Sequence, residues 1–434
     1  MVDHSTRRRA LKAIGLGTLT GLAGCMGGSD PGTSNPTSAT GTQTATSTTG
    51  TTAQKGSETT TKDDAQQKDG DVMDDFENLG AWKNKSGKFG KVTGEDAYMG
   101  SQSAVMVRTS GEPVIERELE VDLAKSNMSI AIKLEADSHA VCDVTLFNDD
   151  DGNSVTFAES IRSSASGYWH RLDLGASNVS GLPDLSKVTH IRITMKGGGS
   201  GGKLMLDDLR KVPSPDKGYV ALVFDDAQDS DYTKAFQTLK QYDIPATSAL
   251  VTNHVDGDGF LSMKQIDEMK SAGWEMTSQT ANHANLLEAG RLEAEREIVG
   301  AKEWLVDHGF KQGAKSFTYP YGLYNEQVNA FVNKHHDMAY GYFSARNATS
   351  GYITDPMTIS RGDATNNPRA KSMVDLAHLY NEVAVLTFHG IDRGGELDVS
   401  SQQFNDFAKY LADSKVETIT LSQVADVAQP KGGW

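Results

Sequence analysis

The feature that most constrains this fold is a regular alternation of strand-like and helix-like segments in the second half of the chain. It begins after Pro213-Ser214-Pro215, a boundary signal, with a buried-strand run at residues 219–224. The further strand-like runs are residues 246–251, 316–319 and 383–388, and the helix-like runs are residues 233–241, 262–272, 293–308 and 326–334. A repeated strand-then-helix order predicts a parallel sheet with helices outside, whose site lies at the carboxyl ends of the strands.

The preceding segment, residues 71–212, shows only strand signals. Short β-favouring runs are separated by Gly, Ser, Asn and Asp, and several of them alternate apolar and polar residues. These runs are residues 104–108, 128–134, 140–147, 190–195 and 203–209. Alternation with turn residues between the runs predicts an antiparallel β-sandwich.

The bulk properties limit the classes of function. The chain has 434 residues, which predicts two or three domains, and only two cysteines, which excludes a disulfide framework. Its net charge of -16 argues against a nucleic-acid partner, because no basic surface is available for phosphates. The same acidity suits solubility in concentrated salt, so a halophilic source, a salt-loving archaeon, is expected.

The N-terminus has the features of an export signal. Thr6-Arg7-Arg8-Arg9-Ala10-Leu11-Lys12 resembles a twin-arginine motif, and the apolar stretch at residues 13–23 is short for a transmembrane helix. Leu22-Ala23-Gly24-Cys25 resembles a lipobox, in which Cys25 would carry the lipid. Residues 1–25 are therefore expected to be a lipoprotein signal that anchors the protein on the outer face of the cytoplasmic membrane. The alternative is a short hydrophobic helix beside a chance cysteine. Residues 26–70, rich in Ser, Thr and Gly, are expected to be a disordered linker.

Parts of the β-rich segment resemble a jelly-roll carbohydrate-binding module. They are Asp75-Phe76-Glu77, the run at residues 100–104, the run at residues 168–174, and Leu206-Asp207-Asp208-Leu209. The resemblance implies a structural calcium held by Glu77, Asp207 and Asp208, with solvated carboxylates at strand ends as the alternative. Trp82 and Trp169 would stack on sugar rings or belong to the core.

Polar residues at the ends of the later strands occur in a specific order. They are Val223-Phe224-Asp225-Asp226, Ser278-Gln279-Thr280-Ala281-Asn282-His283, Tyr319-Pro320-Tyr321-Gly322 and Leu386-Thr387-Phe388-His389. In this order they resemble the motifs of the NodB-type polysaccharide deacetylase family. The resemblance covers residues 219–427 and implies a distorted (β/α) barrel for residues 213–434.

The family resemblance implies a role for each matching residue. Asp226 would bind a divalent metal, most simply zinc, and Asp225 would be the general base. The backbone N–H of Tyr321 would face the oxyanion, and His389 would protonate the departing amine. Arg361 would hold Asp225 ionised and oriented. For each residue alone the alternative is structural, namely a helix cap or a satisfied buried side chain.

The chain departs from the family pattern at two positions. Gln279 stands where the family has the first of two zinc-binding histidines, the second being His283, and an amide oxygen is a poorer zinc ligand than imidazole. Thr318 replaces an arginine, so orientation of the base falls on Arg361. Three outcomes follow: a metal on Asp226, His283 and either Gln279 or water; recruitment of His254; or a silent site.

The leading hypothesis is therefore a metal-dependent hydrolase that removes N-acetyl groups from a cell-surface or extracellular polysaccharide. The sandwich would hold the polymer near the site. The rival hypothesis is a polysaccharide-binding surface lipoprotein that has lost turnover. A purely structural surface protein is a third class.

Overall fold

The computed structural model of the protein describes residues 70–148, 152–344 and 350–428. The expected twin-arginine signal, the lipid-bearing Cys25 and the linker up to residue 69 lie outside the described residues. Across the described ranges, no helix combines the length and the apolar character needed to span a bilayer.

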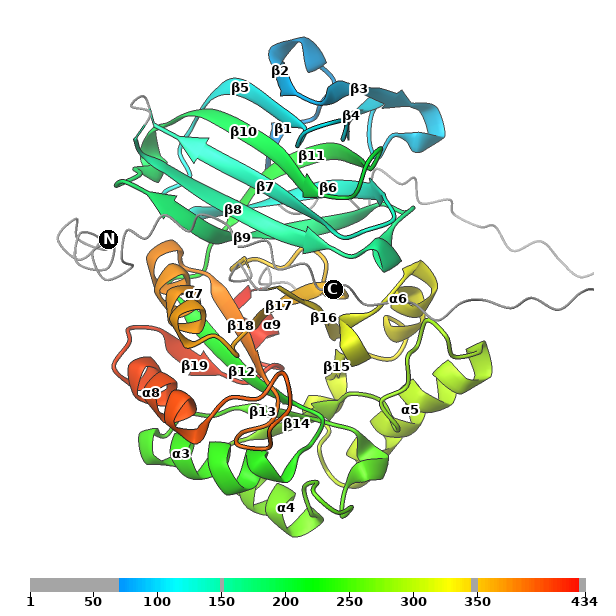
Figure 1. Ribbon diagram of the computed structural model, residues 1–434, viewed down its shortest axis with the longest axis vertical. Coiled ribbons are helices and arrows are strands. Elements are labelled where there is room, and N and C mark those ends of the chain that lie inside the picture. Colours follow the sequence, from blue (N-terminus) through cyan, green and yellow to red (C-terminus); the bar gives the residue numbers. More distant parts are fainter. Residues whose placement is uncertain (1–69, 149–151, 345–349, 429–434) are drawn as a thin grey trace, which may run out of the picture. The chain divides into compact units, whose positions relative to one another are not determined.

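The first half of the described chain is all-β. Eleven strands form an antiparallel sheet in the order β2-β5-β10-β7-β8-β9-β6-β11-β4-β3, and β1 pairs with β11 (Figure 1). The bounds are β1 (Asp71–Asp74), β2 (Lys83–Ser86), β3 (Lys88–Thr93), β4 (Gln102–Val107), β5 (Val114–Val121), β6 (Ser126–Glu135), β7 (Ala140–Phe147), β8 (Ser154–Ile161), β9 (His170–Ser180), β10 (Val188–Gly197) and β11 (Lys203–Pro213). The structure contains the five strands that the sequence predicted in this all-β segment. The jelly-roll topology stays a prediction.

The two tryptophans that the sequence marked as sugar-stacking candidates have different surroundings. Trp82 is 5% exposed, its ring stacks on Phe76 at 5.5 Å, and its indole N–H donates to Asp74. Trp169 is half-buried, donates its indole N–H to the Asp96 carbonyl and lies against Tyr98. Trp82 is therefore a core residue, and of the two only Trp169 is left accessible to a sugar.

The carboxylates expected to hold calcium have other partners in this structure. Asp208 is buried and pairs with Arg171 at 2.7 Å and with Arg210 at 2.8 Å. Asp207 accepts from Ser103 and from the Met99 N–H, while Glu77 accepts from the N–H groups of residues 101 and 102. Two arginines neutralise Asp208, so it does not fit a calcium ligand, and the expectation of a three-carboxylate site is corrected. The alternative of solvated carboxylates is also wrong for Asp207 and Asp208, because both are buried.

The second half of the described chain is a closed parallel barrel. The seven strands β12 to β18 pair in a ring that closes where β12 contacts both β13 and β18, and β19 (Glu417–Ile419) joins β12. They are β12 (Tyr219–Asp225), β13 (Thr247–Leu250), β14 (Glu275–Ser278), β15 (Ser316–Thr318), β16 (Met338–Ser344), β17 (Ile359–Asp363) and β18 (Val383–Phe388). The predicted parallel barrel is therefore present.

Helices surround the ring of strands (Figure 1). They are α3 (Gln237–Leu239), α4 (Met263–Ser271), α5 (Arg291–Asp307), α6 (Glu326–Val332), α7 (Asn367–Tyr380) and α8 (Ser401–Ala412), and the short α9 (Val424–Ala428) follows β19. Ser262 and Ser400 start α4 and α8, because each hydroxyl accepts from an N–H three residues on and each forms a full capping box. The caps fix where the outer helices begin, and hence how long the loops over the strand ends are.

His336 offers a test of how the barrel core responds to acid. It is 3% exposed beside Phe317, and burial, followed by the positive charge of Lys302, lowers its pKa to about 3. In the unfolded chain the ring takes up a proton below a pH of about 6.5, whereas in the folded chain it does so only near 3. Acidification between these values therefore favours the unfolded state and lowers stability.

We expect His336→Phe to reduce this loss, because the phenyl ring packs similarly and does not titrate. Between pH 7 and pH 4.5 the parent should lose about 2–3 kcal/mol more unfolding free energy than the variant. Urea unfolding at pH 7 and at pH 4.5 measures this loss of unfolding free energy. Replacement of the exposed His139 by Phe is the control. Acidification has the opposite effect on stability at buried Asp207, because its pKa is raised to about 6 in the folded chain. The informative quantity is therefore the difference in stability loss between the parent and the His336→Phe variant. Equal losses in parent and variant would contradict the prediction.

Candidate active site

The expected catalytic side chains meet at the carboxyl ends of the barrel strands. Asp225 ends β12 and Asp226 follows it, His283 lies in the loop after β14, and His389 follows β18. The Asp226 carboxylate lies 3.4 Å from His283, and the Asp225 carboxylate lies 3.8 Å from His389. Side chains separated by more than 160 positions in the sequence are thus brought into one group, as parallel strands that end on one face require.

Asp225 is held by a buried ion pair. Both residues of the pair are nearly inaccessible, and the Nη1 of Arg361 lies 2.8 Å from each carboxylate oxygen of Asp225. The Nε of Arg361 donates to the Gly341 carbonyl at 3.2 Å, which fixes the guanidinium on β17. Arg361 therefore contacts Asp225 as the family resemblance implied, and it orients the carboxylate without a contribution from Thr318.

The backbone around Asp226 and His283 is strained. Asp226, Thr280 and His283 have φ angles of 77°, 68° and 59°, in the left-handed region that residues with side chains rarely adopt. Strained positions of this kind persist where surrounding contacts hold them, and they concentrate at functional sites. The Asp226 and His283 side chains stay 28% and 21% exposed, so solvent and a ligand can reach them.

Asp226 and His283 fit a divalent cation. Two ligand atoms on a tetrahedral zinc, each about 2.0–2.2 Å from the metal, lie roughly 3.3 Å apart. The 3.4 Å between the Asp226 carboxylate oxygen and His283 Nε2 matches that separation.

Gln279 does not fit as a third ligand in this geometry. Its Oε1 accepts the backbone N–H of Asp226 at 2.9 Å, and its Nε2 lies 3.1 Å from His283 Nε2. An amide N–H cannot bind a cation. In the part of the chain that the structure describes, no group of three or more His, Cys, Asp or Glu side chains is arranged to hold a metal. In this geometry Gln279 turns its N–H, and not its oxygen, toward His283, and its assignment as a metal ligand stays a prediction.

His254 does not replace the missing histidine. Its backbone segment lies beside the motif loop, because Asn253 N–H donates to the Ala281 carbonyl. The His254 ring, however, packs against Phe260 with the ring centres 4.6 Å apart, and it belongs to no metal-binding group among the described residues. The expected recruitment of His254 is not supported.

Tyr321 has the geometry expected of an oxyanion donor. The residue follows Pro320 with φ 60° and ψ 7°, and no carbonyl or side chain of the described residues accepts its N–H. Its ring is 57% exposed and packs edge-on against the His283 ring at 4.5 Å. The unused N–H and the exposed ring therefore border the same small area as Asp226 and His283.

Sequence reasoning missed Glu297, which positions the His283 loop. This α5 residue is 6% exposed, and its carboxylate accepts from the backbone N–H of Asn282 at 2.8 Å and from the Asn282 side chain at 2.6 Å. The signal was present, because Glu297 lies on the apolar face of α5 together with Ala301. A charged residue on a buried stripe needs a polar partner, which here is the loop that carries His283.

Asp231 is a second residue that the sequence did not single out. It is fully buried in a π-helical turn (Asp231–Phe236), and one carboxylate oxygen accepts from Ser248 at 2.8 Å. Burial, together with the negative charges of Asp226 and Asp225, raises its pKa well above the ordinary range. Burial therefore favours the protonated form of Asp231, which lies close enough to Asp225 and Asp226 to feel their charges.

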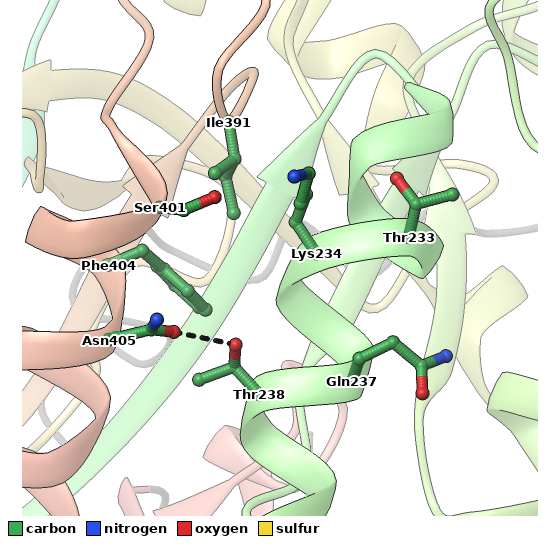
Figure 2. A pocket seen from close by; sticks show the side chains of 8 residues that line it. All are labelled: Thr233, Lys234, Gln237, Thr238, Ile391, Ser401, Phe404 and Asn405. Carbon is green, nitrogen blue, oxygen red and sulfur yellow. Dashed lines mark hydrogen bonds between the residues drawn. The ribbon is translucent and has the colours of Figure 1, made fainter.

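A small pocket on the barrel lies apart from this site. Figure 2 shows it between the segment that leads into α3 and helix α8, with Thr238 hydrogen-bonded to Asn405 at 2.8 Å. Its volume is about 150 Å³, and it is lined by Thr233, Lys234, Gln237, Thr238, Ile391, Ser401, Phe404 and Asn405. None of the candidate catalytic residues lines it.

Comparison with known proteins agrees with this site. Residues 213–340 match the model of the family described as polysaccharide deacetylase. The match runs from the start of the barrel into β16, and so includes Asp225, Asp226 and His283 but neither Arg361 nor His389. Residues 213–340 are therefore similar in sequence to polysaccharide deacetylases.

Two similar curated proteins bear the same name. A poly-β-1,6-N-acetyl-D-glucosamine N-deacetylase of Staphylococcus epidermidis is 33% identical over 140 residues, 29% of this chain and 48% of that protein. Its counterpart in Staphylococcus aureus is 30% identical over 132 residues, 27% of this chain and 45% of that protein. The chain thus spans about half the length of these relatives.

Among solved structures, the peptidoglycan deacetylase PdaC from Bacillus subtilis aligns at 18% identity and a TM-score of 0.36, over 49% of this chain and 92% of that one.

Proposed function

We propose that the barrel hydrolyses the N-acetyl groups of an amino-sugar polysaccharide. The observation that carries the proposal is the convergence of a buried, arginine-held Asp225, a second carboxylate with its histidine, and His389 at one end of the barrel. Amide hydrolysis needs a base for water, a donor to the oxyanion and an acid for the departing nitrogen. All three are available here.

Each protein group has one task in this scheme. Asp225 accepts a proton from the water that attacks the acetamide carbonyl, and the contact with Arg361 orients Asp225 for that purpose. The unused N–H of Tyr321 donates to the oxyanion as the carbonyl becomes tetrahedral. His389 then gives a proton to the sugar nitrogen, so that acetate and a free amine separate.

A divalent cation bound by Asp226 and His283 would polarise the acetamide carbonyl and make bound water more acidic. Zinc is the metal proposed, because one carboxylate and one imidazole are ligands that zinc accepts.

The substrate class is proposed from chemistry and from the relatives. The curated relatives are named for a β-1,6-linked N-acetylglucosamine polymer. The exposed Tyr321 ring beside His283 offers a flat apolar surface to a sugar ring. We therefore propose a polymer of N-acetylated amino sugars as substrate, with the β-rich segment, through Trp169, as its holding surface.

The test is release of acetate by the purified full chain from N-acetylglucosamine oligomers, in concentrated salt with Zn²⁺ in excess. We expect release from acetylated oligomers and none from the same oligomers after chemical deacetylation, and a chelator should lower the rate at least tenfold. Absence of both bound metal and release, with release restored by Gln279→His, would refute the proposal for the natural protein.

A binding protein without turnover is the second candidate. The orientation of Gln279, which removes one protein ligand from the metal, favours it. It predicts that oligomers bind to the chain and remain acetylated.

The cellular setting is also a proposal. The twin-arginine motif and Cys25 support export followed by attachment through a lipid, which would place the barrel on the outer face of the cytoplasmic membrane. An extracellular position suits a polysaccharide substrate.

A further inference from the structure

The amide of Gln279 has only one orientation that its surroundings allow. The residue is 2% exposed, and the backbone N–H of Asp226 points at its side chain at 2.9 Å. A backbone N–H can only donate, so the amide oxygen must face it. The amide NH₂ is therefore the group that lies 3.1 Å from His283 Nε2.

This orientation determines the state of His283. The amide N–H is a donor at 3.1 Å, so His283 Nε2 accepts from it and presents its lone pair to the amide. The same lone pair would bind a cation shared with Asp226, whose carboxylate lies 3.4 Å away. The Gln279 N–H thus occupies the coordinating position of His283.

We propose that Gln279 is a placeholder for the cation. Its amide N–H satisfies His283 when no cation is bound, and a divalent cation must displace it before His283 can coordinate. Gln279 therefore lowers metal affinity in two ways, because it supplies no ligand and because it competes with the metal. This deepens the proposed function and rests on it for the identity of the pocket.

The two contributions differ in size. A neutral hydrogen bond is worth about a fivefold change in an equilibrium constant, so competition alone should weaken cation binding by about that factor. A missing imidazole ligand costs far more, because even outer-shell changes alter metal affinity by about 10- to 100-fold. The Zn²⁺ affinities of suitable variants can therefore distinguish the cost of competition from the cost of the missing ligand.

Three substitutions at Gln279 separate them. Gln279→Met keeps the length of the side chain but has no N–H, so it removes the competitor without adding a strong ligand. Gln279→Glu keeps an oxygen for the Asp226 N–H and turns the second one toward His283 and the cation. Gln279→His supplies the imidazole that this position lacks.

The experiment is calorimetric titration of Zn²⁺ into the metal-stripped full chain, with Co²⁺ absorption as an independent reading of ligand type. We expect the Met variant to bind about fivefold more tightly than the parent, the Glu variant at least about tenfold and the His variant at least about a hundredfold. Thermal unfolding of each variant checks the fold.

Two results would overturn the proposal. If Gln279→Met binds Zn²⁺ equally or more weakly than the parent, the amide does not compete or is itself a ligand. If the Met variant does not fold, the Glu variant decides, and an affinity equal to that of the parent overturns it. Zinc binding can be measured without turnover. A failure of the expected order of Zn²⁺ affinities among the variants is therefore distinguishable from a failure of acetate release.

Discussion

Replacing Asp225 with asparagine should lower the rate of acetate release by about 10²- to 10⁴-fold, the usual contribution of a general base. Asparagine has nearly the same shape, but its amide oxygen cannot accept a proton from water at neutral pH. The affinity for Zn²⁺ should stay within a few-fold of the parent, because Asp226 and His283, not Asp225, lie at ligand distance from each other.

The measurement is the initial rate of acetate release at saturating Zn²⁺, well below the unfolding temperature of the variant. Asp267→Asn, on the exposed face of α4, is the matched control and should keep the parental rate. A rate within threefold of the parent for Asp225→Asn would remove this residue from the role of base. A large loss of Zn²⁺ affinity would instead make it a ligand.

The site could be predicted from the sequence as far as it depends on topology. Parallel strands bring their carboxyl ends to one face, so motifs after β12, β15 and β18 had to converge. Contact between Arg361 and Asp225 followed from the family resemblance, and the distance of 2.8 Å in the structure agrees with it. The orientation of Gln279 could not be predicted, because it depends on where one backbone N–H of the Asp226 turn points.

Two of the strands that the sequence missed are short or carry polar residues. β14 covers only Glu275–Ser278 and is buried through threonine and serine, and β17 carries Arg361 and Gly362 in place of an apolar run. Periodicity identifies strands from their apolar side chains, so it overlooks strands in which polar residues or glycine replace part of the apolar run. The predicted helix at residues 233–241 begins two residues earlier in the structure, where buried Asp231 starts a π-helical turn that the sequence pattern does not reveal.

Buried charge accounts for the error in the β-rich segment. Asp208 was interpreted as a calcium ligand or a solvated carboxylate, and it is instead neutralised by Arg171 and Arg210. Arg210 lies two residues from Asp208 on the same strand, β11, whereas Arg171 comes from β9, so the pairing with Arg171 depends on strand register. Register is a property of the folded sheet that isolated motifs do not specify.

Removing the partner of Asp225 should have the largest effect on stability. We expect Arg361→Met to lower the free energy of unfolding by about 3–5 kcal/mol, because it leaves a buried carboxylate without its counter-ion. The side-chain exposures of 2% for Arg361 and 3% for Asp225 mean that water cannot replace the guanidinium. The double variant Asp225→Asn with Arg361→Met should recover most of the loss, since it also removes the unpaired buried charge.

Urea unfolding of the parent, both single variants and the double variant gives the coupling energy directly. If the two single losses simply add, Arg361 packs in the barrel without holding Asp225, and the base then depends on another group for its orientation.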